Sequence, residues 1–282
     1  ASGGATPANR RSDIAPTSAG RPLRRRSTAT VPIRRYSLNI FGAIGVAAAG
    51  YLIGSISFAR IVAGRVLPEA DLSSTSLTWG EDDTGFVSDN VSETTIRHEA
   101  GTRWGCLTGT FDILKAAIPV AILHFGFPDQ PYDVIYGIAV TAGHNLPLYY
   151  RFQGGRGTST ILGALLILDP LAIPVTILLG YAIGLFIFKD VLLAHHAGWI
   201  VILPFWFAAW QKWDLVVFAL GVNFFRWIVS ADELKGYWQL RKSGELRTRE
   251  FHEAIEQSHI GYIHKYVRKW GWLKYDYMND EA

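Results

Sequence analysis

The chain has 282 residues, of which 49% are hydrophobic, 13% aromatic and 18% charged, and its formal net charge is only +3. Charged residues are missing from long parts of the second half, such as residues 158–168 and 171–188, which is rare in soluble domains. Cys106 is the only cysteine, which excludes an intrachain disulfide and a metal site of several thiolates. The sequence therefore predicts an all-α fold, a polytopic integral membrane helical bundle of about seven short transmembrane helices, since a span needs about 20 apolar residues and somewhat fewer where it is buried among other helices.

Residues 1–36 are predicted to form a disordered basic N-terminal tail, because they are rich in small polar residues and cannot bury a core. They carry eight arginines against one acidic residue, Asp13. We interpret the tail as a solvated segment near anionic lipid head groups. An organelle transit segment, which has a similar composition, is the alternative.

The first predicted span covers residues 38–62 and carries a face of small residues that lets a second helix approach closely. The longest polar connection follows at residues 63–103 and holds eight acidic residues. A loop of this length without an apolar pattern is more often functional than idle. We therefore expect part of a functional site in this loop.

Apolar runs predict the remaining spans. The run at residues 158–188 is too long for one helix, and Asp169-Pro170 divides it, because proline lacks the N–H of the helical ladder and restricts the residue before it. The other spans are predicted at residues 104–127, 132–150, 191–210 and 215–229, with tryptophans where head groups lie.

The chain becomes charged again after the last span. Apolar residues recur at helical spacing from Phe251 to Val267, which favours an amphipathic helix on the membrane or against the bundle over chemistry by its histidines. The predicted domains are thus the tail 1–36, a transmembrane domain at 37–230 and a cytoplasmic amphipathic C-terminal tail at 231–282.

The orientation follows from the basic residues. The segment after Ser230 holds nine lysines and arginines, which places it in the cytoplasm by the positive-inside rule. With seven spans, the loops at residues 63–103 and 151–157 face the same side. The arginine-rich N-terminus then lies on the opposite side, against the rule.

Polar clusters border or interrupt several spans, where ionisable groups cost free energy and are kept for use. One of them contains Asp112 and Lys115, whose spacing of three residues puts acid and base on one helical face as an ion pair. The four clusters lie at residues 54–58, 88–103, 112–115 and 143–158.

The turn Gly154-Gly155-Arg156-Gly157 is the most informative of these features. Bare backbone amides, the positive end of the helix that follows and a guanidinium together predict a cradle for an anion or a phosphate. We expect a positive φ at Gly155, which only glycine adopts easily. The alternative is a tight turn between helices with an arginine at the membrane interface.

Taken together, these clusters resemble the bacterial acyl-phosphate:glycerol-3-phosphate acyltransferases, the PlsY family. The stretch from Gly143-His144-Asn145-Leu146-Pro147 to Gly157 is similar to the family's Gly-His-x-Phe-Pro…Phe-x-Gly-Gly-Lys-Gly motif, with Arg156 in the place of the lysine. Weaker similarities follow the same order over about residues 50–170: residues 54–58 to Gly-Ser-Ile-Pro-Phe, residues 88–95 to Ser-Gly-Asn-x-Gly-Ala-Thr-Asn, and residues 112–119 to Asp-x-x-Lys…Pro.

The resemblance implies an enzyme, an acyl-phosphate-dependent acyltransferase that acylates the 1-hydroxyl of glycerol 3-phosphate and gives lysophosphatidic acid in phospholipid synthesis. It implies membrane lipids as partners, but no nucleic acid, no metal, no cofactor and no thioester donor. An acyl phosphate is already activated, so the protein mainly has to position two anions and stabilise developing charge. The implied location is a multi-pass position in a bacterial inner membrane, with an organelle inner membrane as the alternative.

The same resemblance suggests which residues form the site. Ser88, Lys115 and His144 are the catalytic candidates, although Lys115 and His144 are expected to act by positioning, and His144 fits a structural hydrogen bond between helices equally well. The substrate-binding candidates all offer hydrogen-bond donors, from backbone amides, guanidinium groups or side-chain amides. They are Asn90, Arg97, Asn145, Gly154, Gly155, Arg156 and Gly157.

A departure from the family pattern keeps other functions open. The family's third motif, a His and an Asn after the last spans, has only partial candidates here, Asn223 with Arg226 and residues 239–245. A catalytically decayed homologue that serves as a structural subunit of a membrane complex is therefore the main alternative. A transporter is a weaker one, because the broken helix at Asp169-Pro170 is not accompanied by an inverted repeat.

Overall fold

The computed structural model describes residues 3–4, 36–68, 75–78, 85–88, 92–188, 196, 198–243, 263, 265–266 and 269–271. The chain divides into two units, Ala1–Pro32 and Ile33–Ala282, and all the elements below belong to the second. Asn90 and most of the predicted amphipathic helix at residues 251–267 lie outside the described residues.

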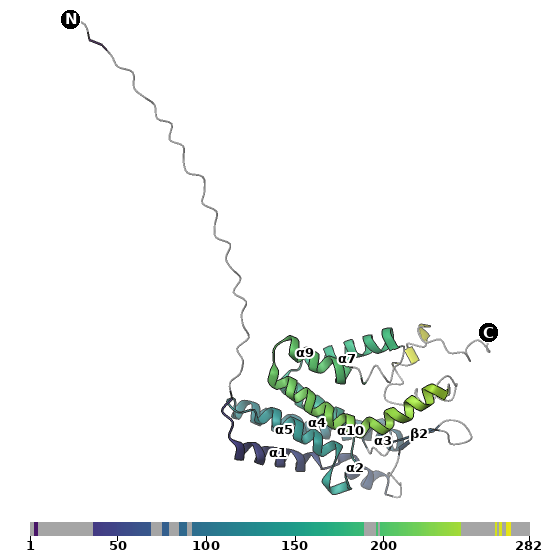
Figure 1. Cartoon of the computed structure of the whole chain (residues 1–282). Helices are drawn as coiled ribbons and strands as arrows, with labels where there is room; N and C mark the ends of the chain where they lie inside the picture. Colours follow the sequence, from purple (N-terminus) through teal and green to yellow (C-terminus); the bar gives the residue numbers. More distant parts are fainter. Residues whose placement is uncertain are drawn as a thin grey trace. The chain divides into compact units, whose positions relative to one another are not determined.

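Helices make up most of the described residues of the second unit (Figure 1). The α-helices are α1 (Ile40–Gly54), α2 (Phe58–Val66), α3 (Glu93–Ala100), α4 (Thr102–Gly126), α5 (Tyr132–Asn145), α6 (Thr158–Leu168), α7 (Ala172–Ile183), α9 (Leu203–Ala209) and α10 (Trp213–Ser243). A 3-10 turn η1 (Leu148–Tyr150) follows α5, and two π-helical segments, η2 (Gly184–Phe188) and η3 (Gly198–Ile202), follow α7 and precede α9.

This arrangement confirms the predicted helical membrane bundle. Large apolar side chains remain exposed along the helices, such as Phe41 at 86% and Leu178 at 69%, which is typical of a surface that faces lipid. Among the described residues, the stretches long and apolar enough to cross a membrane are Ile40–Val66, Thr102–Gly126 and Trp213–Ala231, and the shorter apolar helices are Thr158–Leu168, Ala172–Ile183 and Gly198–Ala209.

The first predicted span differs from a single helix. α1 ends at Gly54 and α2 begins at Phe58, so the backbone between them leaves the helical ladder. The side chain of Ser57 accepts a hydrogen bond from the amide of Arg60 and thereby caps α2. The break therefore arises from a capping serine, although no proline interrupts the apolar pattern.

The division at Asp169-Pro170 is confirmed. α6 ends at Leu168 and α7 begins at Ala172, whose amide donates to the carboxylate of Asp169 over 3.3 Å. α10 instead continues to Ser243, beyond the predicted end of the last span at residue 229. The last span and the beginning of the predicted C-terminal tail are thus one helix.

The polar connection between α2 and α3 contains a small antiparallel hairpin, which its polar pattern does not predict. β1 (Thr75–Thr78) pairs with β2 (Gly85–Ser88), with Thr75 opposite Ser88. β2 also contacts α10. The connection therefore returns to the bundle beside the last helix.

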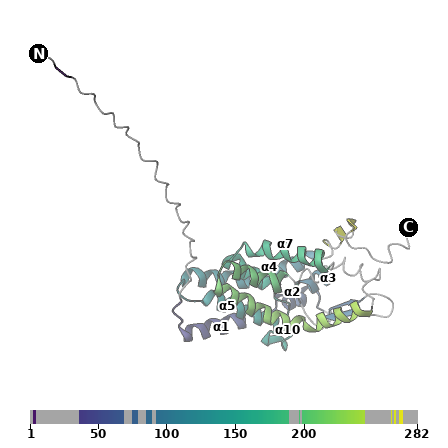
Figure 2. The ribbon, with the colours of Figure 1, turned by 45° about the horizontal axis from the view of Figure 1, so that its top comes forward.

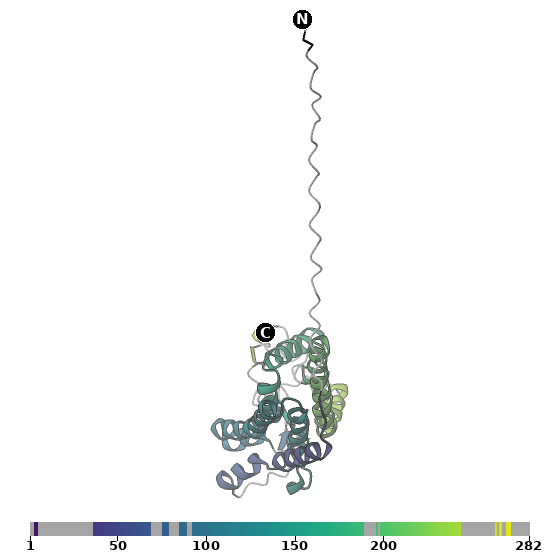
Figure 3. The same ribbon diagram turned by 90° about the vertical axis from the view of Figure 1, so that its left-hand side faces the viewer.

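α5 lies within the bundle and packs against α1, α4, α6 and α10 (Figures 2 and 3). Glycines allow a close approach, because a side chain at Gly143 of α5 would collide with the carbonyl of Tyr51 on α1. The ends of α1 and α5 and the beginning of α6 lie beside the middle of α4, in a region that we call the site end.

Candidate active site

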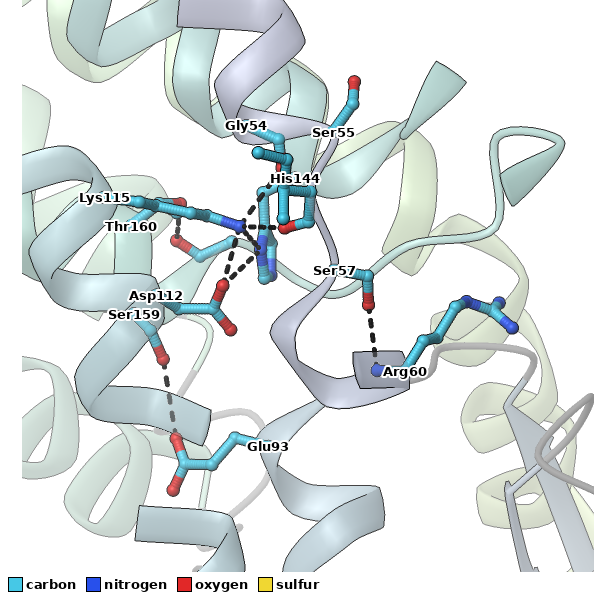
Figure 4. A network of polar contacts seen from close by, with 12 residues as sticks. Gly54, Ser55, Ser57, Arg60, Glu93, Asp112, Lys115, His144, Ser159 and Thr160 are labelled. Atoms are coloured by element: carbon cyan, nitrogen blue, oxygen red, sulfur yellow. Dashed lines mark hydrogen bonds and ion pairs between the residues drawn. The ribbon is translucent and has the colours of Figure 1, made fainter. Parts of the chain in front are cut away.

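A lysine ammonium group lies at the centre of the site end. Nζ of Lys115 on α4 lies 2.6 Å from Oδ1 of Asp112, one turn earlier, and 3.1 Å from Nδ1 of His144 at the end of α5. It also donates to the carbonyls of Gly54 over 3.1 Å and Ile56 over 2.9 Å, at the break between α1 and α2. Figure 4 shows these groups converging on Nζ from three parts of the chain. We call Asp112, Lys115 and His144 the ammonium cluster.

The ammonium cluster is buried, and its geometry fits a protonated lysine. The side chains of Lys115 and Asp112 are only 4% and 2% exposed, and charges removed from water persist when they are paired and hydrogen-bonded. The carbonyls at the C-terminal end of α1 add partial negative charge. Nδ1 of His144 also lies 3.4 Å from Oδ1 of Asp112, so the imidazole contacts both members of the ion pair.

The glycine hairpin, residues 154–157, packs against the end of α5. The amide of Gly155 donates to the carbonyl of His144 over 3.1 Å, so it is engaged in the turn and is not bare. A side chain at Gly155 would collide with Nε2 of His144. The expected positive φ at Gly155 is wrong, because the left-handed residue is Gly157, with φ 76°. A side chain at Gly157 would also collide with Oδ1 of Asn145.

Two arginines from other helices hold the hairpin. Arg226 on α10 is fully buried and donates to the carbonyl of Arg156 over 3.2 Å and to Oγ1 of Thr158 over 2.8 Å. Arg60 on α2 donates to the carbonyl of Gln153 over 3.1 Å. The hairpin is thereby tied to helices far away in the sequence, and two positive charges lie next to it.

A carboxylate borders the beginning of α6. Glu93 is the first residue of α3, and its Oε1 accepts a hydrogen bond from Arg97. Its Oε2 lies 3.5 Å from Oγ of Ser159, in the first turn of α6 (Figure 4). A side chain at Gly109 of α4 would come within 2.7 Å of the same oxygen. An acidic group therefore lies beside a helix end where the sequence predicts an anionic ligand.

The structure brings together most of the predicted site residues. Lys115, His144, Asn145 and the glycine hairpin meet at the site end. Arg97 lies nearby on α3, but its guanidinium group is bonded to Glu93. Of the remaining two, Ser88 ends β2 and only its backbone is described, whereas Asn90 lies outside the described residues.

Three other residues border the site, namely Arg60 and Glu93, which the sequence analysis does not single out, and Arg226, one of its partial candidates for the third motif. Arg226 interrupts an otherwise apolar span, and a charge within a span is the signal that identifies it. Arg60 and Glu93 give no such signal, because charges near helix ends and in polar loops are ordinary. Their place in the site depends on contacts with distant segments, which the sequence pattern does not contain.

Known proteins that are similar to this chain come from the family that the sequence resembles. Residues 44–236 match the profile of the family described as glycerol-3-phosphate acyltransferase. Glycerol-3-phosphate acyltransferase 5 of Dehalococcoides mccartyi is 32% identical over 57% of this chain and 62% of its own length. The acyltransferase of Myxococcus xanthus is 36% identical over 44% of this chain and 58% of its own, so the chain spans about three fifths of these relatives. That of Burkholderia lata is 31% identical over 68% of this chain and 80% of its own.

Two solved crystal structures of PlsY, an integral membrane glycerol 3-phosphate acyltransferase, have a similar fold. The glycerol 3-phosphate form gives a TM-score of 0.57 at 25% identity and covers 71% of this chain and 94% of that one. The lysophosphatidic acid form gives 0.56 at 23% identity and covers 71% and 93%. These likenesses confirm a membrane protein with the predicted helical fold.

Proposed function

Because the chain belongs to the glycerol-3-phosphate acyltransferase family, we propose that it transfers a fatty acyl group from acyl phosphate to glycerol 3-phosphate. The product is lysophosphatidic acid, an intermediate of phospholipid synthesis. The two forms in which PlsY has been solved are named for the same acceptor and product, which supports this assignment.

The observation that carries the proposal is the buried amide of Asn145 beside the glycine hairpin. Asn145 is 0% exposed, and within the described part of the chain neither its Nδ2 nor its Oδ1 has a hydrogen-bond partner. A buried amide without partners costs free energy, so such a group calls for a ligand or a water molecule. Glycerol 3-phosphate carries both hydroxyl donors and phosphate acceptors and can satisfy both atoms.

In the proposed complex, the glycine hairpin and the first turn of α6 hold the phosphate. Arg156 supplies a guanidinium, and the amides of Gly154 and Gly157 supply further donors, while Gly155 shapes the turn through His144. We assign Ser88, Asn90 and Arg97 to the same pocket.

The proposed reaction joins the two substrates directly. The 1-hydroxyl oxygen attacks the acyl carbon, the bond between that carbon and the phosphate oxygen breaks, and the hydroxyl proton ends on the released inorganic phosphate. The protein holds the two anions together and stabilises the charge that develops on the acyl oxygen. Lys115 and His144 act as positioning residues, because they fix the break after α1 and the hairpin.

The proposed location is a bacterial inner membrane with the site end in the cytoplasm. Three observations support a one-sided site: Arg60 bonds to Gln153, Glu93 approaches Ser159, and β2 contacts α10. They join the two loops and the last helix, whose far end leads to the basic tail.

The test is turnover by the purified protein in lipid bicelles with radiolabelled glycerol 3-phosphate. We expect lysophosphatidic acid with palmitoyl phosphate and none with palmitoyl-CoA or palmitoyl-acyl carrier protein. Turnover with palmitoyl-CoA alone contradicts the proposed donor. No turnover with any donor, from protein that unfolds cooperatively, contradicts the enzyme and supports the structural-subunit alternative.

A further inference from the structure

The carboxylate of Glu93 occupies a position that favours a bound anion. It lies against the first turn of α6, whose unbonded amides carry partial positive charge. α4 has a glycine, Gly109, where it passes Glu93, and a side chain there would come within 2.7 Å of Oε2 of Glu93. Three helices therefore accommodate this acidic group next to the glycine hairpin.

The contact between Glu93 and α6 is the weaker of the two contacts that its oxygens make. The 3.5 Å from Oε2 to Oγ of Ser159 is at the upper limit of a hydrogen bond, whereas Oε1 is in close contact with Arg97. Arg97 is on α3 itself, four residues later, and the Glu93 side chain is 30% exposed. Glu93 can thus leave α6 without losing its countercharge.

We propose that Glu93 is a built-in competitor for the phosphate group of the acceptor substrate. The bound phosphate displaces the carboxylate from the first turn of α6, because two anions at one helix end repel each other. Glu93 thereby weakens the binding of glycerol 3-phosphate, and it keeps its contact with Arg97 when it moves away from α6. This inference rests on the proposed function for the identity of the phosphate compound, but not for the competition itself.

The experiment compares the wild-type protein with Glu93→Gln, and uses Glu99→Gln as a matched control on the exposed part of the same helix. Glu93→Gln keeps the shape and removes the charge. We expect its KM for glycerol 3-phosphate to fall by about fivefold or more, with kcat within about twofold of wild type. Glu99→Gln is expected to change neither. Glu93→Asp keeps the charge but shortens the side chain, so its KM for glycerol 3-phosphate is expected to lie between those of Glu93→Gln and the wild type.

Equilibrium titration with inorganic phosphate separates the inference from the proposed function. Tighter phosphate binding by Glu93→Gln than by wild type supports the competition, even if neither protein transfers an acyl group. Equal binding and an unchanged KM overturn it. A large loss of kcat with unchanged KM also overturns it, because Glu93 would then serve the reaction instead of opposing the substrate.

Discussion

The two ends of the bundle use charged groups in different ways. At the site end, Lys115 contacts a carboxylate, an imidazole and two backbone carbonyls from three parts of the chain, and it is almost fully buried. At the opposite end, polar groups pair two by two: Lys212 with Asp169 at 2.6 Å, 43 residues apart in the sequence, and His124 with Asp133 at 2.7 Å, nine residues apart. The Lys212 side chain is 40% exposed.

This difference follows from where the helices are interrupted. At the site end, α1 breaks before α2, and the glycine hairpin follows α5, so polar backbone needs partners inside the bundle. At the opposite end, the connections stay near the surface, as where Ser37 bonds to Asp129 and Tyr36 to Asp214. The site end is thus organised for binding, and the opposite end joins helices.

Cysteine labelling tests whether these really are two ends on two sides of the membrane. In a Cys106→Ser background, Gln153→Cys and Lys242→Cys report on the site end, and Asp129→Cys reports on the opposite end. All three native side chains are exposed. We expect a membrane-impermeant maleimide to label the first two from one side and the third only from the other. Labelling of Gln153→Cys and Asp129→Cys from the same side contradicts the comparison.

Removing the buried ammonium group should have the largest effect on function and stability. Lys115→Met leaves Asp112 buried without its strongest partner, so we expect a loss of about 3 to 5 kcal/mol in the free energy of unfolding. We expect turnover to fall by at least about 100-fold, because the break after α1 loses the group that bonds its carbonyls. Turnover assays measure the effect on function, and unfolding at increasing concentrations of a denaturing detergent measures the loss of stability.

A double variant separates stability from function in this cluster. Asp112→Asn with Lys115→Met removes both charges, so we expect most of the lost stability to return while turnover stays low. Wild-type turnover in the single variant would show that the ammonium cluster is not needed for the site.

The glycine hairpin should show a smaller effect, confined to substrate binding. Arg156→Ala is expected to weaken glycerol 3-phosphate binding by about 1.5 to 3 kcal/mol, as for the loss of a charge-assisted hydrogen bond. Arg156→Lys is expected to retain much of the affinity, because the family has lysine at the matching position. Affinity for glycerol 3-phosphate that stays unchanged in folded Arg156→Ala would make the hairpin a structural turn only.

Much of the fold could be predicted because apolar length and proline act locally. The uncharged runs predict the helices, and Asp169-Pro170 predicts the boundary between α6 and α7. The acid and base of Asp112 and Lys115 could be paired from their spacing alone. The motif around His144 and the glycine hairpin could be placed in one site because its residues are close in the sequence.

Other features could not be predicted because they depend on distant contacts. The break after Gly54 is stabilised by Lys115, sixty-one residues later, and the sequence has no proline there that would predict it. The positive φ lies at Gly157 and not at Gly155. Gly157 packs against the side chain of Asn145 and Gly155 against that of His144, and these contacts across the turn are not visible in the sequence. The role of Glu93 likewise arises from its contact with α6, which the sequence pattern does not reveal, whereas Arg226 could be singled out as a charge within a span but not placed against Thr158.

The smallest effect is expected at the opposite end, and it is the matched control for Lys115. Lys212→Met removes a lysine that is paired with an aspartate at the same 2.6 Å, but the Lys212 side chain is 40% exposed where that of Lys115 is 4%. Asp169 is itself only 7% exposed, but water can replace the half-exposed ammonium group and Asp169 keeps the amide of Ala172, so we expect a smaller loss than for Lys115→Met, about 1 kcal/mol in the free energy of unfolding.

The aspartate of this pair has a second role, which makes the expectation more specific. Oδ1 of Asp169 accepts from the amide of Ala172 at the beginning of α7, so Asp169→Ala removes a helix cap as well as the pair. We expect it to cost about 1 to 2 kcal/mol, more than Lys212→Met. Both variants should keep the kcat and KM of the wild type. A tenfold fall in kcat/KM for Lys212→Met would mean that the opposite end takes part in function, because this pair lies on the connections at that end.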